Sequence, residues 1–454
     1  MRVCGIIAEY NPLHNGHVFQ LKFVRESLGA DFIVVCISGD FVQRGEPAVV
    51  DKYVRTRMAL LAGADLVIEM PLQNACGSAE FFASGAVSVL DSLGVVDHLC
   101  FGAEGESADP GRFMDIARLL SDEPEAFRDE LKTAAAEGLT FAVARERALK
   151  KAALEGLISG EAGKRLFSNI TPESLTSGKV KDEVLKHIVP DHESEHFFSS
   201  PNNILGIEYC KSLLKRNSTI VPVPLPRIGS GYHSESFDQS GFSSASAIRR
   251  LLYKTSGEAE KSDGADKLSA ELCSHMPGQC SELLCEEFRK NSLMFADDLD
   301  QVLFYQLLKE DIPGIIEYQD VTEELGRRIL KLRNEYRGFA QFAGLVKSKN
   351  YTLTRVRRAL LHILLGIKDT DVHHDAAFCR VLGFRKSSAP LLSEIRQKSR
   401  IPLITRPSGY DLSPEAERQY MLHVQASNIY EALVSQKAKV PFVHEFSRQP
   451  VIVS

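Results

Sequence analysis

Two histidines, His14 and His17, stand three residues apart between an apolar run and an amphipathic stretch. Imidazoles in that position can donate hydrogen bonds to phosphate oxygens, and Gly16 between them lets the backbone approach a ligand closely. The first-turn amides of a helix have no intrahelical acceptors and the helix dipole favours negative charge, so this junction predicts a phosphate site. Such donors stabilise charge developing in nucleotidyl transfer without a covalent nucleophile. The alternative is that both histidines only cap the helix.

A second candidate phosphate contact lies far downstream, in the segment GFSSASAIRR at 241–250. Hydroxyl groups at a helix start, followed by a guanidinium one turn later, can clamp the distal phosphates of a triphosphate, which makes Ser246 and Arg249 the candidates. A plain serine N-cap is the alternative. The first loop carries neither G-x-G-x-x-G nor a P-loop motif, which disfavours a dinucleotide site and a P-loop.

Short β-rich runs alternate with helix-length amphipathic stretches through the first hundred residues. This alternation predicts βαβ units around a parallel sheet, and hence the α/β class. Glycines such as Gly29 and Gly94 follow the amphipathic stretches, where helix C-caps belong. Parallel sheets bind ligands at the carboxyl ends of their strands, so the loops after the first four strands are expected to face one crevice. These loops begin after Glu9, Ser38, Met70 and Phe101.

Stretches of different composition follow one another along the 454-residue chain, which is longer than one hydrophobic core usually organises. Residues 1–253 are predicted to form the sheet domain, with a charged, mostly helical insertion at about 105–196. The run 254–267 is rich in Ser, Gly, Asp and Glu, which predicts an exposed linker. Residues 268–454 are predicted to form a mostly helical domain.

The overall charge is mildly acidic, since 60 Asp and Glu against 54 Lys and Arg give a formal net charge of −6. This excludes a globally basic nucleic-acid-binding protein but leaves room for a local basic patch. No apolar run approaches the roughly 20 residues that span a bilayer, so a cytoplasmic protein with no membrane partner is expected. The nine scattered cysteines are expected to be reduced and buried, and no dedicated metal site is predicted.

A basic run follows the second predicted strand, in the segment from Asp40 to Arg57. If Asp51 caps a helix, Lys52 and Arg55 share a face that borders the crevice and can attract an anionic ligand or an RNA backbone. An ordinary solvated charged face explains the run equally well. Asp40, at the end of the second strand, is placed to hold a metal-bound water or to cap the loop.

These motifs together resemble a known family. The loop with His14, Gly16 and His17, combined with Ser-Ala-Ile-Arg at 246–249, is similar to the HIGH-motif nucleotidyltransferase superfamily. More narrowly, the chain resembles the bacterial tRNA(Met) cytidine acetate ligase family in ordered segments that cover most of its length. These segments are GIIAEYNPLHNGH, SGDFVQRGEPAVVDKYVRTRMAL, AGADLVIEMP, FGAE, SPNNILGIEY, PRIGSGYH, FSSASAIRRLL, KSKNYTLTRVRRALLHILLGI and RVLGF. The resemblance implies a Rossmann-like parallel-sheet nucleotidyltransferase domain with a mostly α-helical C-terminal domain.

The resemblance also implies an activity. Members of that family use ATP to activate acetate as acetyl-adenylate, and then transfer the acetyl group to N4 of the wobble cytidine of elongator tRNA(Met), giving N4-acetylcytidine. ATP is therefore expected as a substrate, with Mg²⁺ shielding the leaving pyrophosphate, and His14 and His17 are the expected catalytic residues. Asn202 and Asn203 are alternatives for one nucleotide contact. The full ATP-binding set implied by the motifs is Ile7, Ala8, Glu9, Tyr10, Asn11, Pro12, Leu13, His14, Asn15, Gly16, His17, Val18, Phe19, Gln20, Gly102, Asn202, Asn203, Arg227, Ser246 and Arg249.

Residues 347–358, KSKNYTLTRVRR, hold five cations and no acidic residue, with a tyrosine among them. Cations follow RNA phosphates, and a tyrosine can stack on an unpaired base. A charged face on an otherwise helical domain is the alternative, but the resemblance to an RNA-modifying family favours RNA contact. The candidate tRNA-binding residues are Lys347, Lys349, Tyr351, Arg355, Arg357 and Arg358.

Two other functions fit parts of the sequence. An adenylyltransferase acting on a small phosphorylated cofactor precursor would use both phosphate loops, but it leaves the basic helical half without a role. A non-catalytic RNA-binding protein that senses ATP would bind both ligands without turnover. Acetate-dependent formation of AMP and pyrophosphate separates the acetate ligase from both alternatives.

Overall fold

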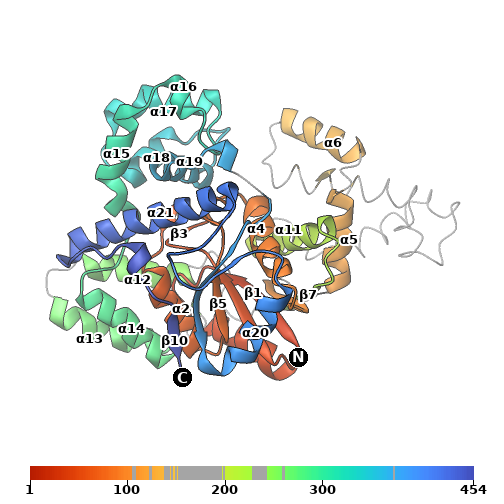
Figure 1. The fold of residues 1–454 in the computed structure, drawn as a ribbon. Coiled ribbons are helices and arrows are strands. Elements are labelled where there is room, and N and C mark those ends of the chain that lie inside the picture. The colour runs from red at the N-terminus through yellow and green to blue at the C-terminus, as the bar shows by residue number, and fades with distance from the viewer. Residues whose placement is uncertain are drawn as a thin grey trace, which may run out of the picture. The chain divides into compact units, whose positions relative to one another are not determined.

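The computed structural model describes residues 1–104, 109–121, 125–137, 144, 147–148, 151, 197, 200–226, 243–257, 261–371 and 374–454. The chain divides into two compact units, residues 1–99 with 228–454 and residues 100–227. The first unit thus combines the N-terminal and C-terminal parts of the chain (Figure 1). The predicted boundary at 254–267 lies inside this unit, and a division of nucleotide and RNA domains at that place stays a prediction.

Three parallel strands form the core of the first unit. They are β1 (Val3–Ala8), β2 (Phe32–Ile37) and β5 (Leu66–Glu69). Val3 pairs with Phe32 and Val34 with Leu66, which sets the parallel register. Nearly every residue of these strands is buried, which accounts for their continuous apolar runs. The predicted α/β class is confirmed, and the carboxyl ends of these three strands lie at one edge of the sheet.

Three C-terminal strands complete the sheet of the first unit. They are β8 (Cys379–Arg385), β9 (Leu403–Ile404) and β10 (Val451–Val453). The order is β10-β8-β5-β2-β1 with β9 beside β8, and β8 runs antiparallel to β5 (Figure 1). The prediction of a mostly helical C-terminal region misses these strands, because a run as short as RVLGF becomes a strand through its pairing with β5.

Helices follow the parallel strands. They are α1 (Asn15–Lys22), which a π-helical turn continues (η1, Phe23–Ser27), α2 (Lys52–Leu61), the short α3 (Leu72–Ala75) and α4 (Ala79–Ser92). Gly29 and Gly94 lie just beyond helix ends with φ of +67° and +68°, as expected for C-terminal glycines. The loop after β2 contains a hairpin that the sequence did not predict. Its strands are β3 (Phe41–Val42) and β4 (Glu46–Pro47).

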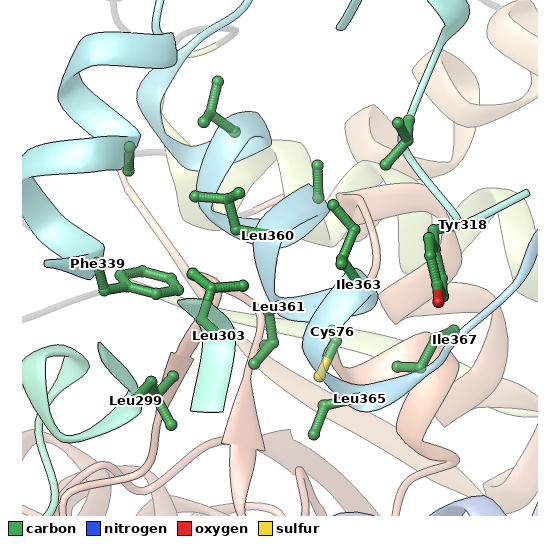
Figure 2. Close-up of a cluster of buried hydrophobic side chains, with 14 of the residues drawn as sticks. Cys76, Leu299, Leu303, Tyr318, Phe339, Leu360, Leu361, Ile363, Leu365 and Ile367 are labelled. Carbon is green, nitrogen blue, oxygen red and sulfur yellow. The ribbon is translucent and has the colours of Figure 1, made fainter. Parts of the chain in front are cut away.

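A second hydrophobic core lies among the helices of residues 296–365. These are η3 (Ala296–Leu299), α15 (Asp300–Lys309), α16 (Ile312–Ile315), α17 (Glu323–Leu332), α18 (Phe339–Val346) and α19 (Leu353–Leu365). Leu303, Phe339 and Leu360 are fully buried in this core, and Cys76, from the segment after β5, belongs to it as well (Figure 2). α15 and α19 agree with the mostly helical character predicted for this part of the chain, and the shared core joins them to the segment after β5.

A buried histidine ties α19 to the segment after β5. Nδ1 of His362 lies 2.9 Å from the carbonyl oxygen of Gln319, and Nε2 lies 3.0 Å from that of Cys76. Burial lowers the pKa of His362, although Asp320 and the two carbonyl groups favour the charged ring. A neutral imidazole has one N–H group. The neutral ring can therefore donate to only one of these two carbonyl oxygens at a time.

Helices continue through the predicted linker. They are α12 (Ala245–Ser256), α13 (Lys261–Leu272) and α14 (Gly278–Arg289), and α20 (Ala389–Lys398) and α21 (Pro414–Ala438) follow later. The expected exposed loop at 254–267 therefore holds the end of α12 and most of α13. Ala265, Leu268 and Leu272 recur at helical spacing and are buried, and this apolar stripe outweighs the polar composition of the run.

The second unit contains its own helices and strands. They are β6 (His98–Ala103), α5 (Pro110–Ser121), α6 (Glu125–Ala136), α11 (Pro201–Lys215) and β7 (Val221–Pro226). The first two residues of β6 precede the boundary of this unit. A Cβ at Gly206 would lie 2.5 Å from the ring of Phe101, so a glycine is required for α11 to approach β6. The predicted helical insertion is represented by α5 and α6, and most of its remainder lies outside the described residues. No helix in the described ranges has the length and apolar character needed to cross a bilayer.

Candidate functional site

The first loop leaves β1 at the edge where the parallel strands end. Tyr10 is buried and takes a φ of +48°, which turns the chain out of the strand. The Asn11 side chain accepts a hydrogen bond from the amide of Val49 at 2.8 Å, which holds the loop against the segment before α2. The predicted nucleotide segment 7–20 thus runs from the end of β1, through a buried turn, into α1.

His14 and His17 lie together at the start of α1 and form a reciprocal cap. Nδ1 of His14 accepts from the amide of Gly16 at 3.1 Å, and Nδ1 of His17 accepts from the amide of His14 at 3.2 Å. Their ring centroids are 3.8 Å apart, and the Tyr10 ring meets His17 edge-on at 4.7 Å. Both histidines therefore cap α1.

The capping bonds determine what chemistry these rings can do. A nitrogen that accepts a hydrogen bond carries no proton, so each neutral ring carries its proton on Nε2. That arrangement gives two N–H donors on adjacent rings held in fixed orientation by the backbone. Capping the helix and donating to a phosphate are thus compatible roles for His14 and His17, because they use opposite nitrogens of the ring.

The first-turn amides of α1 are arranged differently from the prediction. The amide of Asn15 donates to the carbonyl oxygen of His275 at 2.9 Å, and the amide of Gly16 donates to the His14 ring. The Asn15 side chain also donates to the carbonyl oxygen of Ser274, at 2.9 Å. Protein groups therefore satisfy these amides in the structure. Any anion bound here meets side-chain donors first.

The second candidate motif lies against the first loop. Nη1 of Arg249 donates to the carbonyl oxygen of Asn11 at 2.7 Å, and Nη2 lies 3.3 Å from Oγ of Ser246. Ser244 caps α12 by accepting from the amide of Ala247 at 3.2 Å. The structure thus brings together segments 238 residues apart, as the two-loop prediction requires, and the serine cap is present as well.

The basic residues of α2 are placed differently from the prediction. Asp51 caps α2 by accepting from the amide of Val54 at 2.7 Å, as expected. Arg55, however, is fully buried and donates to the carbonyl oxygens of Glu9 at 2.7 Å and Ser38 at 3.0 Å. It is not part of an open basic face but joins the ends of β1 and β2. The planar guanidinium presents its N–H donors in a fixed fork, which lets one side chain bind carbonyl oxygens of both segments.

Lys52 is the centre of a buried charge network. Its ammonium lies 2.9 Å from Oε1 of Glu69 and 3.0 Å from Oε1 of Glu445, and it donates to Oγ of Ser427 at 2.8 Å. Burial lowers the pKa of Lys52, but Glu445 and Glu69 raise it by more, so the ammonium stays charged. The sequence missed this network because its members come from α2, β5, α21 and the C-terminal segment, and no local pattern connects them.

The predicted RNA segment begins with exposed lysines and continues into paired arginines. Lys347 and Lys349 are exposed in the loop before α19. Arg357 pairs with Glu46, and Arg358 lies 3.0 Å from Asp320. The two arginines are partly buried, so the lysines present the more accessible positive charge.

Tyr351 is placed differently from the prediction that it stacks on a base. Its side chain is 5% exposed, and its hydroxyl contacts Oγ1 of Thr322 at 2.8 Å and donates to Glu324 at 3.0 Å. The guanidinium of Arg355 lies over the Tyr351 ring, 5.2 Å from its centroid. In this structure the tyrosine supports the loop and orients Arg355.

The second unit holds three further predicted residues. Gly102 lies in β6, and Asn202 and Asn203 lie in the first turn of α11. The Asn203 amide accepts from the Glu104 amide at 2.8 Å and donates to the Glu104 carbonyl oxygen at 3.0 Å, whereas Asn202 donates to the Glu104 carboxylate at 2.8 Å. Asn203 is fully buried and Asn202 is partly exposed. Arg227 lies outside the described residues.

Candidate metal ligands do not cluster in the part of the chain that the structure describes. No group of three or more His, Cys, Asp or Glu side chains in the described ranges is arranged to hold a metal ion. Asp40 accepts from the amide of Lys52 at 2.8 Å, and the Asp40 carbonyl oxygen accepts from the amide of Ala48 at 2.8 Å. Asp40 therefore caps its loop, which was one of the two roles considered.

A parallel sheet with a histidine pair at the end of its first strand defines a class, the α/β nucleotidyltransferases with a HIGH-type loop. The family described as HIGH Nucleotidyl Transferase matches residues 1–442. The tRNA(Met) cytidine acetate ligases of Acetivibrio thermocellus and of Thermoanaerobacter sp. strain X514 are each 36% identical to this chain, over 461 and 449 residues. The first match covers 100% of both chains, and the second covers 98% of this chain and 99% of the relative.

Solved structures give the same result. Thermotoga maritima TmcAL bound with alpha-thio ATP is 29% identical, with a TM-score of 0.79 over 100% of both chains. Its apo form gives a TM-score of 0.81 at the same identity and coverage. The chain belongs to the tRNA(Met) cytidine acetate ligase family.

Proposed function

We propose that this chain is an ATP-dependent tRNA(Met) cytidine acetate ligase. The observation that carries the proposal is the 36% identity to a tRNA(Met) cytidine acetate ligase over the full length of both chains. The histidine pair and Arg249, which meet at the first loop, supply donors suited to a triphosphate. A cytoplasmic location fits an enzyme whose substrate is tRNA.

The proposed reaction has two steps. An acetate oxygen attacks the α-phosphorus of ATP, and the bond between the α-phosphorus and the bridging oxygen breaks, so that pyrophosphate leaves with its electrons. N4 of the wobble cytidine then attacks the acetyl carbon, AMP leaves, and N4 gives up a proton. Acetate is a weak nucleophile, so alignment and stabilisation of the phosphate charge limit the first step. Nε2–H groups of His14 and His17 are proposed to donate to the phosphate oxygens.

Mg²⁺ is proposed to bind together with ATP. Hard cations bind phosphate oxygens of a substrate with few protein ligands, and a bound Mg²⁺ would shield the charge of the leaving pyrophosphate. The residues of this chain need only hold and align the triphosphate, which is the role given to the first loop and α12.

Mass spectrometry of nucleosides tests the function directly. Total tRNA is incubated with the protein, ATP and labelled acetate, and labelled N4-acetylcytidine in elongator tRNA(Met) is the expected product. A dinucleotide formed without acetate would support the adenylyltransferase, and tight ATP binding without turnover would support an ATP-sensing RNA-binding protein. Either result would replace the proposal.

Asn202 is the proposed nucleotide contact of the asparagine pair, since both amide atoms of Asn203 bond to the Glu104 backbone. Asn202→Ala is expected to raise the KM for ATP about tenfold, the effect of losing one hydrogen bond to a charged group, and to cost less stability than Asn203→Ala because its bond to the Glu104 carboxylate is partly exposed. Asn203→Ala is expected to cost about 1–3 kcal/mol of unfolding free energy, because it leaves two backbone groups unsatisfied. Urea unfolding and steady-state kinetics measure both effects, and the reverse pattern would assign the contact to Asn203.

Lys347 and Lys349 are the proposed contacts to the tRNA backbone. The double variant Lys347→Ala/Lys349→Ala is expected to weaken tRNA binding and to reduce the salt dependence of log Kd by about 1.5, because two phosphate contacts are lost. Acetate-dependent pyrophosphate exchange without tRNA is expected to stay at the wild-type rate. The matched control Lys398→Ala/Lys439→Ala removes two exposed lysines elsewhere. An equal loss of binding in both double variants would make the effect one of net charge.

A further inference from the structure

The β3–β4 hairpin, residues 41–47, lies between the nucleotide loop and the RNA segment. On one side, the amide of Gln43 donates to the carboxylate of Glu9 at 2.9 Å. Glu9 belongs to the segment 7–20 proposed to bind ATP, and its own carbonyl oxygen is held by Arg55. The hairpin is thus joined directly to the loop that holds His14 and His17.

On its other side the hairpin touches the backbone of α19. Gly45 has a φ of +73°, and a Cβ at this position would lie 2.5 Å from the carbonyl carbon of Arg357 and from the nitrogen of Arg358. Next to it, the Glu46 carboxylate pairs with the Arg357 guanidinium. Only a glycine permits this approach, and the ion pair fixes the side chain of an arginine proposed to meet RNA.

The base of the hairpin is held firmly. The carbonyl oxygen of Asp40 accepts from the amide of Ala48 at 2.8 Å, and the buried Phe41 ring meets Tyr430 of α21 edge-on at 6.1 Å. Tyr430 also donates to the carbonyl oxygen of Ala48 at 2.8 Å. With the base fixed, a displacement at the tip, where Glu46 meets Arg357, reaches the Gln43 amide within three residues.

We propose that this hairpin couples RNA binding at α19 to nucleotide binding at the first loop, with Glu46 as a positioning residue. An RNA phosphate near Arg357 competes with Glu46 for the guanidinium and releases the hairpin tip, and the Gln43–Glu9 hydrogen bond passes the change to the first loop. Coupling of this kind is reciprocal, so ATP changes the affinity for tRNA by the same factor. A shared element that both ligands displace is the physical requirement for such coupling.

A binding cycle tests the coupling. The Kd of tRNA(Met) is measured by fluorescence anisotropy with and without saturating α,β-methylene-ATP, and the ratio of the two values is the coupling factor. In the wild type this ratio is expected to differ from one by about fivefold or more, the usual range for coupled sites. In Glu46→Gln it is expected to fall within twofold of one, while the Kd of the ATP analogue without tRNA stays at the wild-type value.

Glu323→Gln is the matched control, because it removes a carboxylate from an exposed ion pair with Arg327 on α17. Its coupling factor is expected to equal that of the wild type, which separates a role of the hairpin from a general change in charge. Gly45→Ala, whose Cβ pushes the hairpin away from α19, is expected to lose the coupling as Glu46→Gln does. A wild-type factor of one, or an unchanged factor in both hairpin variants, would overturn the proposal.

The coupling rests on the proposed function in that it takes ATP and tRNA as the two ligands. Its test measures binding alone, so it can fail while acetylation is observed. A chain that bound both ligands with a large coupling factor but formed no acetylcytidine would keep the coupling and lose the ligase function.

Discussion

His17→Ala is expected to reduce acetate-dependent ATP–pyrophosphate exchange by about 10²–10³-fold, the usual effect of removing one preorganised donor from a site of developing charge. The variant loses the Nε2–H donor of His17, and it also loses the acceptor for the amide of His14, which His17 supplies at 3.2 Å. Exchange of labelled pyrophosphate into ATP measures the step without tRNA.

His17→Asn separates the two losses. The side-chain oxygen of asparagine occupies the place of Nδ1 and can accept from the His14 amide, whereas nothing replaces Nε2. If the donor is what matters, His17→Asn is as inactive as His17→Ala although α1 remains capped. Recovery of exchange in His17→Asn would show that the histidine acts only through the cap, and the proposed catalytic role would be withdrawn.

Lys52→Met is expected to have the largest effect on stability. It leaves Glu69 and Glu445 buried without their shared cation, and breaking a buried pair in this way usually costs about 3–5 kcal/mol. Burial raises the pKa of Glu69, but Lys52 and His423 lower it by more, so Glu69 is ionised at neutral pH in the folded protein. Urea unfolding followed by circular dichroism measures the loss.

Two comparisons give this prediction its specificity. A triple variant, Lys52→Met/Glu69→Gln/Glu445→Gln, is expected to regain part of the stability, because burying a neutral amide has a smaller desolvation free energy than burying an unpaired carboxylate. Lys398→Met, which breaks an exposed pair with Glu394, is expected to leave the unfolding midpoint unchanged. The lowered pKa of Glu69 also predicts how the unfolding free energy depends on pH. The stabilising contribution of Glu69 is present at neutral pH and is lost as the pH falls through the lowered pKa. If Lys52→Met and Lys398→Met lowered the unfolding free energy equally, the buried network would contribute no more to stability than an exposed ion pair.

Much of the first unit could be predicted because local patterns determine it. Continuous apolar runs predicted the parallel strands, glycines beyond the amphipathic stretches predicted the helix ends, and the loop with His14 and His17 predicted a helix start close behind the first strand. The meeting of Arg249 with the first loop followed from assigning both motifs to one triphosphate. In each case the chemistry of a short segment was enough.

The remaining features depend on partners distant in sequence. The first-turn amides of the helix were expected to be available to an anion, but the carbonyl oxygen of His275 accepts from the amide of Asn15. Lys52 and Arg55 were expected on an open face, but carboxylates and carbonyl groups from other segments surround them. Charged residues of this kind are predicted to be exposed unless their buried counterions are known. A single sequence does not identify those counterions.

The position of β8 and β10 has a consequence for how the chain acquires its structure. The edge of β5 is covered only when residues 379–385 pair with it, and Lys52 receives Glu445 from a segment much later in the chain. A sheet assembled from both ends of a chain folds slowly, since distant segments must meet before either is stable. During synthesis the first loop therefore emerges long before the segments that complete this sheet. Until then the β5 edge and the Lys52 charge lack the partners that cover them in the folded protein.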